Sequence, residues 1–424
     1  MDQPRRPNVI IIFTDDQGIG DVSCYGSEIP TPWTDSIGEQ GVKFEQFYVA
    51  APVCTPSRYG LLTGNCPERS QDKLLSPLMP TSDADTDRGV RPGEVVLPHM
   101  FREGGYRTGL VGKWHLGHAD RKFFPTRHGF DYFCGHLAGC IDYWTLNYGN
   151  RPDWYRGEEL AEHEGYATNV ITDEAVRYIE DNRDDPFLLM ISYNAPHYGK
   201  GWDDKEDEFL NILQAPRDYM DKFTHIEDPT RRTYAAMVAC LDDGIGRVLS
   251  ALRTQGLEDD TILIFTSDNG GSIPYGGCNT PFRGQKGTMF EGGIREPYVM
   301  RWPGRLEPGS RSQLVFSTLD MVETLAAFTG CDASEYQTDG MDLSQEILGG
   351  TTRERDLFWS GRKHVAMRQG DLKYVLSEEG EFLFDLGDDP AETTNLNERE
   401  QEEFGRLKEA CEDTLASMSA DTGA

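Results

Sequence analysis

The sequence has little positive charge. Its 424 residues include 41 lysines and arginines but 72 aspartates and glutamates, which gives a formal net charge of −31. Binding to nucleic acid needs a basic surface that neutralises phosphates, so the composition argues against a nucleic-acid-binding protein. An acidic surface also repels anionic substrates at long range, and binding one would require a locally basic pocket.

Long apolar segments are also missing. No run approaches the roughly 20 apolar residues needed to cross a bilayer, so the sequence predicts no membrane span. Residues 1–7 are polar, and no basic region followed by an apolar stretch marks a signal peptide. Two locations are compatible with this pattern: the cytoplasm if Met1 is native, or the periplasm or exterior if a leader has been removed.

The nine cysteines lack the spacing of a zinc site. They are scattered, without a CxxC pair or a Cys/His pattern. Most are expected to be buried thiols, and a few disulfides remain compatible with the spacing. Hydrophobic residues make up 38% of the chain and aromatics 11%, which is typical of a globular protein with a core.

Short apolar runs predict a buried sheet. Three of four such segments are nearly continuous in apolar residues, the pattern of a strand covered on both faces. The predicted strands are residues 8–14, 107–112, 186–193 and 261–267. Helical periodicity lies between them, at residues 168–182 and 230–255. This alternation predicts an α/β fold, with a large mixed, mostly parallel sheet flanked by helices.

The character of the sequence changes after about residue 330. Short strands are predicted at residues 365–367, 372–376 and 381–385, and an acidic amphipathic helix at 398–418. We therefore predict a large domain at residues 1–331. A smaller C-terminal α+β subdomain with an antiparallel sheet is predicted at residues 332–424.

Polar residues follow all four predicted strands of the large domain. They are Asp15 and Asp16, then Lys113, Trp114 and His115, then Asn194 and His197, and finally Asp268, Asn269, Gly270 and Gly271. One such ending would mean little, because Asp, Asn and Gly are ordinary turn residues. Ligands bind beyond the carboxyl ends of strands in open α/β sheets, so four endings together favour one shared site.

Four of these residues offer only oxygen ligands: Asp15, Asp16, Asp268 and Asn269. Such a set suits a hard divalent cation, Ca²⁺ or Mg²⁺, better than zinc. Three clustered carboxylates would also repel one another without a cation. The alternative, that these residues only cap two helices at turns, stays open on this motif alone.

The segment Cys54-Thr55-Pro56-Ser57-Arg58 predicts a helix start. Pro56 suits the first turn, and the helix would place Cys54 near its N-terminus with Arg58 about one turn further on. That position favours a negative charge on Cys54 or on a bound group. A core cysteine followed by a surface arginine is the simpler interpretation of the segment by itself.

Residues 54–58 resemble the signature of the type I, formylglycine-dependent sulfatases of the alkaline phosphatase superfamily. Further segments resemble this family in the same order. They are residues 8–16 (NVIIIFTDD), 59–64 (YGLLTG), 112–117 (GKWHLG), 267–271 (SDNGG), 283–297 (RGQKGTMFEGGIREP) and 387–396 (GDDPAETTNL). No single segment is specific, but the combination is.

The resemblance implies an unusual nucleophile. A maturation enzyme would oxidise Cys54 to formylglycine, an aldehyde whose hydrate carries two hydroxyls. One hydroxyl attacks sulfur and displaces the alcohol, and the other loses a proton so that sulfate leaves as the aldehyde reforms. Serine could be sulfated but could not expel sulfate in this way. The cofactor would be calcium rather than magnesium, held by the modified Cys54 together with the four oxygen-bearing residues.

The resemblance also implies a role for each charged residue. Arg58 would hold the ionised hydrate, and Lys113 and Lys286 would bind sulfate oxygens and stabilise charge in the transition state. His115 is the expected base for the second hydroxyl. His197 would contact the bridging oxygen and protonate the leaving alcohol. Outside these motifs, each would be interpreted as an ordinary loop histidine or surface lysine.

The substrate predicted from the sequence is a sulfated glycan or its oligosaccharides. The aromatic-rich residues 142–156 include Trp144, which could stack on a sugar, and Tyr198, Lys200 and Trp202 could form another wall. His136 and Arg283 are further candidates for substrate contacts, Arg283 as a reader of a second anionic group. The acidic surface disfavours gripping a long polyanion, so action near a chain end is expected.

Three other functions compete with this one. A phosphonate or phosphodiester hydrolase of the same superfamily can share the formylglycine machinery. A non-catalytic glycan-binding protein would keep Cys54 unmodified, although it would not need the pairing of Cys54 with Arg58. A zinc phosphohydrolase would need more histidines and a serine or threonine nucleophile.

Overall fold

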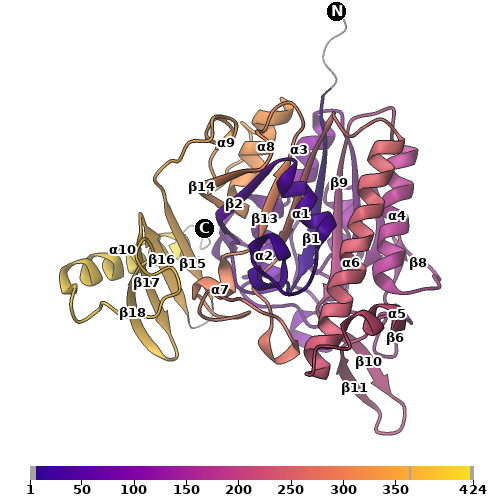
Figure 1. Cartoon of the computed structure of the whole chain (residues 1–424), viewed down its shortest axis with the longest axis horizontal. Coiled ribbons are helices and arrows are strands. Elements are labelled where there is room, and N and C mark those ends of the chain that lie inside the picture. Colours follow the sequence, from indigo (N-terminus) through magenta and orange to yellow (C-terminus); the bar gives the residue numbers. More distant parts are fainter. Residues whose placement is uncertain (1–5, 362–363, 421–424) are drawn as a thin grey trace, which may run out of the picture.

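The computed structural model describes residues 6–361 and 364–420. A ten-stranded sheet runs through the molecule in the order β14-β2-β13-β12-β1-β9-β3-β4-β7-β8 (Figure 1). Its centre consists of β12 (Thr261–Ser267), β1 (Asn8–Asp15), β9 (Phe187–Pro196) and β3 (Arg107–Lys113). These are the four predicted strands. They pair in parallel, which confirms the large, mostly parallel sheet.

Helices cover both faces of this sheet. Side chains of β1 alternate between two cores, with Ile11 in one and Ile12 in the other. The first core includes side chains of α2 (Cys54–Thr63), α3 (Leu97–Glu103) and α8 (Met321–Thr329). The second includes side chains of α1 (Pro32–Glu39), α4 (Ala167–Asp181) and α6 (Pro229–Thr254). The two predicted helices correspond to α4 and α6.

The outer strands were not predicted from the sequence. On one side these are β2 (Val42–Tyr48), β13 (Tyr298–Arg301) and β14 (Ser310–Ser317), and on the other β4 (Tyr132–His136), β7 (Tyr155–Arg156) and β8 (Glu159–Leu160). β13 runs antiparallel to both β12 and β2. The strand β2 therefore points the same way as β12, and its carboxyl end reaches the same edge of the sheet.

Smaller elements surround the sheet. β5 (Asn147–Tyr148) pairs with β6 (Arg151–Pro152), and β10 (Gly199–Asp203) pairs with β11 (Glu208–Ile212) in a hairpin that projects from the body in Figure 1. The short α-helices α5 (Arg217–Met220), α7 (Glu291–Ile294) and α9 (Ser344–Gly349) lie between these elements in the chain, along with several single turns of 3-10 helix.

The C-terminal region contains the expected antiparallel sheet. Its strands, in spatial order, are β15 (Asp356–Ser360), β16 (Val365–Gln369), β17 (Leu372–Ser377) and β18 (Gly380–Asp385). α10 (Gln401–Ala420) packs on one face through Leu407 and Cys411. The other face joins the first core through Trp359 and Val375. Leu343 and Ile347, which follow the predicted domain boundary, also lie in the first core. The boundary at residues 331 and 332 therefore stays a prediction.

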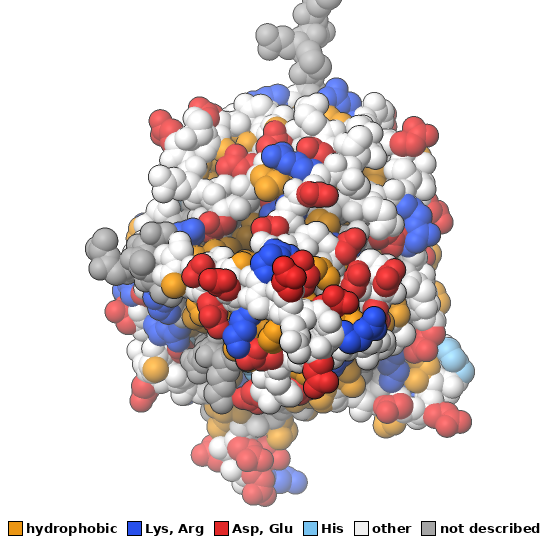
Figure 2. Space-filling view, turned by 90° about the vertical axis from the view of Figure 1, so that its left-hand side faces the viewer, with side chains coloured by type: hydrophobic (Ala, Val, Ile, Leu, Met, Phe, Trp, Pro, Cys, Tyr) orange, Lys and Arg blue, Asp and Glu red, His pale blue; other side chains and the backbone are white. Residues whose placement is uncertain are grey.

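Most cysteines were expected to be buried thiols, and the structure agrees. All nine cysteines lie in the described ranges as free thiols, seven of them buried. Within residues 6–361 and 364–420, no helix is long and apolar enough to cross a membrane. On the face shown in Figure 2, acidic side chains are scattered with lysines and arginines interspersed among them.

Candidate active site

Five strands deliver polar residues to one edge of the sheet. Asp15 ends β1 and Lys113 ends β3, His197 follows β9, and Asp268 follows β12. Cys54 comes soon after β2, the strand that the sequence did not reveal, and all five side chains are buried. Parallel strands end at a common edge, which is why residues distant in sequence meet here.

Cys54 is the first residue of α2, as predicted. Its side chain is 2% exposed, and Arg58 follows one turn later on the same helix. Burial raises the pKa of the Cys54 thiol, an effect that the charges of Lys113 and Lys286 oppose. An unmodified thiol is therefore protonated at neutral pH and is a weak nucleophile.

Three buried carboxylates face three cations. Lys113 Nζ lies 2.6 Å from Asp15 Oδ2. Lys286 Nζ lies 2.8 Å from Asp16 Oδ1, and Arg58 Nη2 lies 2.8 Å from Asp268 Oδ2. The pairs balance in number, which makes a dense cluster of charge tolerable in a dry interior.

The same cluster retains free oxygen atoms. Asp15 Oδ1 and Asn269 Oδ1 are buried and accept no hydrogen bond from the residues that the structure describes. Ligand atoms of Asp15, Cys54 and Asp268 lie within 4.8 Å of one another. Burial and the charge of Asp15 also raise the pKa of Asp268 to about 6. These unsatisfied oxygen atoms fit a hard divalent cation.

A second group of possible ligand atoms overlaps the first. It consists of Asp15, Asp16 and His197. Asn269 Nδ2 donates to Asp16 Oδ1 at 2.8 Å, which turns the amide oxygen away from that carboxylate. The structure thus brings together all five residues predicted to hold the metal: Asp15, Asp16, Cys54, Asp268 and Asn269.

Both predicted catalytic histidines are neutral. Burial, then the charge of Lys113, lowers the pKa of His115 well below its ordinary value, and burial, then Lys286, does the same for His197. His115 Nε2 donates to the Leu78 carbonyl at 2.9 Å, which leaves Nδ1 unprotonated. His197 Nδ1 donates to the Tyr198 carbonyl at 2.7 Å. Each ring therefore keeps one nitrogen that can accept a proton.

Two residues of the site adopt a left-handed backbone. Asp16 has φ of 61° and His115 has φ of 58°, although neither is glycine. Such conformations are costly and persist where the surrounding structure enforces them, often at functional sites. Both residues lie within two positions of the ends of the strands that carry Asp15 and Lys113.

A cavity of about 150 Å³ opens onto the cluster. Cys54, His115, His197 and Lys286 line it, together with Pro77, Leu78, Met79, Pro80, Gly139, Cys140, Tyr148, Tyr198 and Lys200. The wall formed by residues 77–80 was not predicted, because its sequence carries no recognisable chemistry. Ser192, which accepts from Arg58 Nη1 at 2.6 Å, was also missed, since it lies inside a buried strand without any polar pattern.

Of the residues predicted to contact substrate, Tyr198 and Lys200 line this cavity, whereas His136, Trp144 and Arg283 do not. His136 is fully buried beside Lys113 in the β3–β4 register, and Trp144 is 49% exposed. Arg283 is bound to Glu379 and lies over the ring of Phe290. Substrate contacts by these three residues stay predictions, and the geometry gives Arg283 a different partner.

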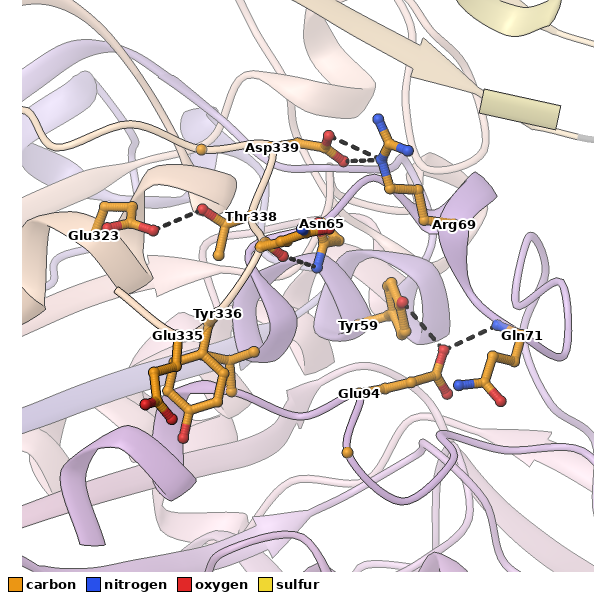
Figure 3. Close-up of a pocket in the computed structure, with 14 residues that line it drawn as sticks. Tyr59, Asn65, Arg69, Gln71, Glu94, Glu323, Glu335, Tyr336, Thr338 and Asp339 are labelled. Carbon is orange, nitrogen blue, oxygen red and sulfur yellow. Dashed lines mark hydrogen bonds and ion pairs between the residues drawn. The ribbon is translucent and has the colours of Figure 1, made fainter. Parts of the chain in front are cut away.

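A larger cavity lies elsewhere, and Figure 3 shows it. Its volume is about 840 Å³, and its lining includes Glu94, Glu323, Glu335 and Asp339. The one cation among the described lining residues, Arg69, is held by Asp339 at 2.9 Å. An acidic wall suits a sulfate ester poorly, and none of the proposed catalytic residues lines it. The smaller cavity at Cys54 is therefore the candidate active site.

Comparison with known proteins agrees with this geometry. A family model described as Sulfatase matches residues 7–331. Arylsulfatase J of Mus musculus is 35% identical over 363 residues, which cover 82% of this chain and 57% of that protein, so the chain spans little more than half of this relative. N-acetylgalactosamine-6-sulfatase of Canis lupus familiaris is 32% identical over 395 residues, which cover 87% and 72%.

A solved structure matches over almost the whole chain. The crystal structure of Ps i-CgsB in complex with k-i-k-neocarrahexaose superimposes with a TM-score of 0.87 at 28% sequence identity, covering 97% of this chain and 93% of that one. Residues 7–331, which the family model matches, contain every residue of the cluster around Cys54. The chain belongs to the sulfatase family, a family of sulfuric ester hydrolases.

Proposed function

We propose that this protein hydrolyses sulfate monoesters on a sulfated carbohydrate, with a formylglycine made from Cys54 and a calcium ion in its active site. The observation that carries the proposal is the placement of Cys54. It lies among three carboxylates and three cations, on the wall of a cavity at the carboxyl edge of the sheet.

The residues present fit both groups. Asp15, Asp16, Asp268 and Asn269, with the modified residue 54, would hold calcium, which supplies positive charge toward the ester oxygens. A hydrated formylglycine supplies one hydroxyl as the nucleophile for sulfur and a second through which sulfate is released. The protonated state of the Cys54 thiol supports the need for this conversion.

The cations of the chain would bind the sulfate group. Lys286 lines the cavity, and Lys113 is buried against Asp15. Both ammonium groups can bind sulfate oxygens and stabilise the charge that develops as the ester bond breaks. Arg58 is fixed by Asp268 and Ser192, so its guanidinium holds a constant position beside residue 54.

The histidines would move protons. His115 lines the cavity and has an unprotonated Nδ1, so it can accept a proton from the second hydroxyl. His197 can contact the bridging oxygen. Its lowered pKa means that Nε2 carries no proton at rest, so His197 would first have to take up the proton that the attacking hydroxyl loses before it could donate one to the leaving alcohol.

The carbohydrate substrate is inferred from the cavity and the relatives. Tyr148 and Tyr198 offer aromatic walls, and Lys200 adds a further cation whose Nζ is held by Asn211 at 2.8 Å. One relative is named for N-acetylgalactosamine 6-sulfate chemistry, and one structural neighbour holds an oligosaccharide. The small cavity and the net charge of −31 support action near the end of a chain.

The proposal is tested by mass spectrometry followed by substrate assays. After expression with a competent maturation enzyme, the peptide containing Cys54 should lose about 18 Da, the change from thiol to aldehyde. The modified protein should then release sulfate from short sulfated oligosaccharides faster than from intact polymer. Activity on phosphonate monoesters but not on sulfates would support the phosphonate hydrolase instead. An unmodified thiol would favour a binding protein.

A further inference from the structure

The loop that carries Lys286 is held at both ends by the C-terminal region. This loop, residues 283–291, runs from Arg283 to the start of α7. We propose that Lys373 and Glu392, two residues of the C-terminal region, are positioning residues that place Lys286 for catalysis. The inference rests on the proposed function of Lys286 in binding sulfate.

A buried ion cluster holds the distal end of the loop. Glu392 Oε2 accepts from the backbone N–H of Glu291 at 2.6 Å. Lys373 Nζ, on β17, lies 2.8 Å from both Glu291 Oε1 and Glu392 Oε1. All three side chains are fully buried. Glu392 thus holds the backbone N–H of Glu291 directly and the carboxylate of Glu291 through Lys373. Glu291 is the last residue of the loop.

The proximal end is held by Arg283. Its Nη2 atom lies 2.7 Å from Glu379, in the turn between β17 and β18, and Nη1 donates to the Glu392 carbonyl at 3.4 Å. Its guanidinium also lies over Phe290 and Phe382. The backbone carbonyl of Arg283 accepts from Gly292 at 2.7 Å, which closes the loop at its base.

The middle of the loop meets the active site. Gly287 donates to the Pro52 carbonyl at 2.8 Å, close to Cys54 in the chain, and Lys286 reaches Asp16. A displacement of the anchored ends would therefore move the ammonium group relative to the sulfate position. Misplacement by about 1 Å can reduce a rate by about 100-fold.

Stability alone does not explain the ion cluster. Burying two carboxylates and an ammonium costs desolvation, and such clusters are often no more stable than well-packed apolar groups. Arg295, 3.2 Å from Glu291, and Tyr48, which donates to Glu291 at 2.7 Å, add further geometric constraints. The cluster defines the position of Glu291 from several directions, which is what a precise loop anchor requires.

The test uses the full-length, formylglycine-containing protein. Glu392→Gln keeps the size of the side chain and an acceptor for the Glu291 N–H but removes the charge facing Lys373. Arg283→Met releases the other end and is a second variant in case the first fails to fold. Arg355→Met is the matched control, because Arg355 is also buried in the C-terminal region but pairs with Asp320 instead.

Both loop variants should lower kcat/KM on an aryl sulfate by about 10-fold to 100-fold, with faster hydrogen exchange in residues 283–291. The control should change kcat/KM by less than about 3-fold. In a Lys286→Ala background, Glu392→Gln should add almost no further loss, because both changes act through the same ammonium group.

Equal losses from Glu392→Gln in both backgrounds, or unchanged hydrogen exchange in the loop, would overturn the inference. An inactive parent protein with a fully converted residue 54 would instead refute the proposed function. In that case hydrogen exchange of residues 283–291 in the variants still decides whether the C-terminal region holds the loop.

Discussion

Charge at the level of single residues governs the candidate active site. The Cys54 thiol is kept protonated by burial, and His115 and His197 are kept neutral by burial and nearby lysines. The charged groups are instead the carboxylates and the cations paired with them. Under the proposed function, a formylglycine at residue 54 would supply the nucleophile that this cluster lacks, and a divalent cation would bind the carboxylates.

Replacement of Cys54 by serine tests the nucleophile. A serine cannot form the aldehyde, so turnover should fall by more than about 10³-fold. Intact mass should show a sulfate adduct after incubation with substrate. Cys66→Ser is the matched control, because Cys66 is also buried but lies outside the cavity, and its variant should keep its activity. Turnover by Cys54→Ser at the parent rate would contradict the proposal.

Calcium should stabilise the fold through the same residues. A ligand present at 100 times its dissociation constant adds about 2.7 kcal/mol to the free energy of unfolding. Thermal unfolding should therefore move to higher temperature with Ca²⁺ and lower temperature with EDTA. Asp15→Asn should lose most of the shift, whereas Asp339→Asn, which changes a carboxylate bound to Arg69, should keep it. A calcium-independent midpoint in the parent protein would exclude the site.

At the scale of elements, close strand contacts hold the polar residues together. A Cβ atom on Gly135, in β4, would lie 1.9 Å from the Gly112 carbonyl oxygen in β3. The next residues along these two strands are His136 and Lys113, which face each other in register. Two glycines therefore let adjacent strands approach where the site needs them.

Gly135→Ala should lower both stability and activity. Overpacking costs about 1–3 kcal/mol, and a backbone oxygen cannot move aside as a side chain can. Gly405→Ala is the control, because nothing lies within 4 Å of its added Cβ in α10 and alanine favours a helix by up to about 1 kcal/mol. Thermal unfolding and kcat should fall for the first variant only. An equal gain in stability for the two variants would contradict the prediction, because it would show that β3 and β4 can move apart to accommodate the added Cβ.

Asp153 holds the segment after β4. Its carboxylate accepts from the backbone of Leu137 at 3.2 Å and Ala138 at 2.9 Å, and burial raises its pKa to about 7 although these hydrogen bonds oppose the shift. Between about pH 4 and pH 7 the unfolded carboxyl has lost its proton while the folded one keeps it. Raising the pH through this window therefore removes stability, by at most about 4 kcal/mol.

Asp153→Asn should flatten this pH dependence, since the amide does not titrate. Chemical denaturation at pH 4.5, 5.5, 6.5 and 7.5 would measure the free energy of unfolding of both proteins. The difference between variant and parent should grow in favour of the variant as the pH rises. A parallel pH dependence in the two proteins would show that Asp153 is ionised in the fold throughout.

At the scale of the whole molecule, the acidic excess acts as self-repulsion. A net charge of −31 spread over the surface opposes the compact state. The Debye length falls from about 30 Å at 0.01 M salt to about 3 Å at 1 M, so salt should screen this repulsion. The thermal midpoint should rise with NaCl when calcium is held at saturation. A falling midpoint would mean that favourable surface ion pairs dominate.

The central part of the fold could be predicted from the sequence. The apolar runs of β1, β9 and β12 and the helical period of α6 are local patterns, and they appear where they were expected. β2 was missed because its sequence, VKFEQFY, mixes polar and apolar residues in a half-buried strand. β15 was missed because it is a strand of only five residues at the edge of the C-terminal sheet. Strands near an edge lack the continuous apolar signal that a twice-covered strand shows.

By itself, the sequence determined the strand cores, the polar residues at the strand ends and the helix start at Cys54. Only the tertiary structure decided that Lys113 pairs with Asp15, which ring nitrogens of His115 and His197 stay free, and that Arg283 binds Glu379. Residue type and periodicity are local properties of a chain. Which charges meet depends on distances between segments that packing alone sets.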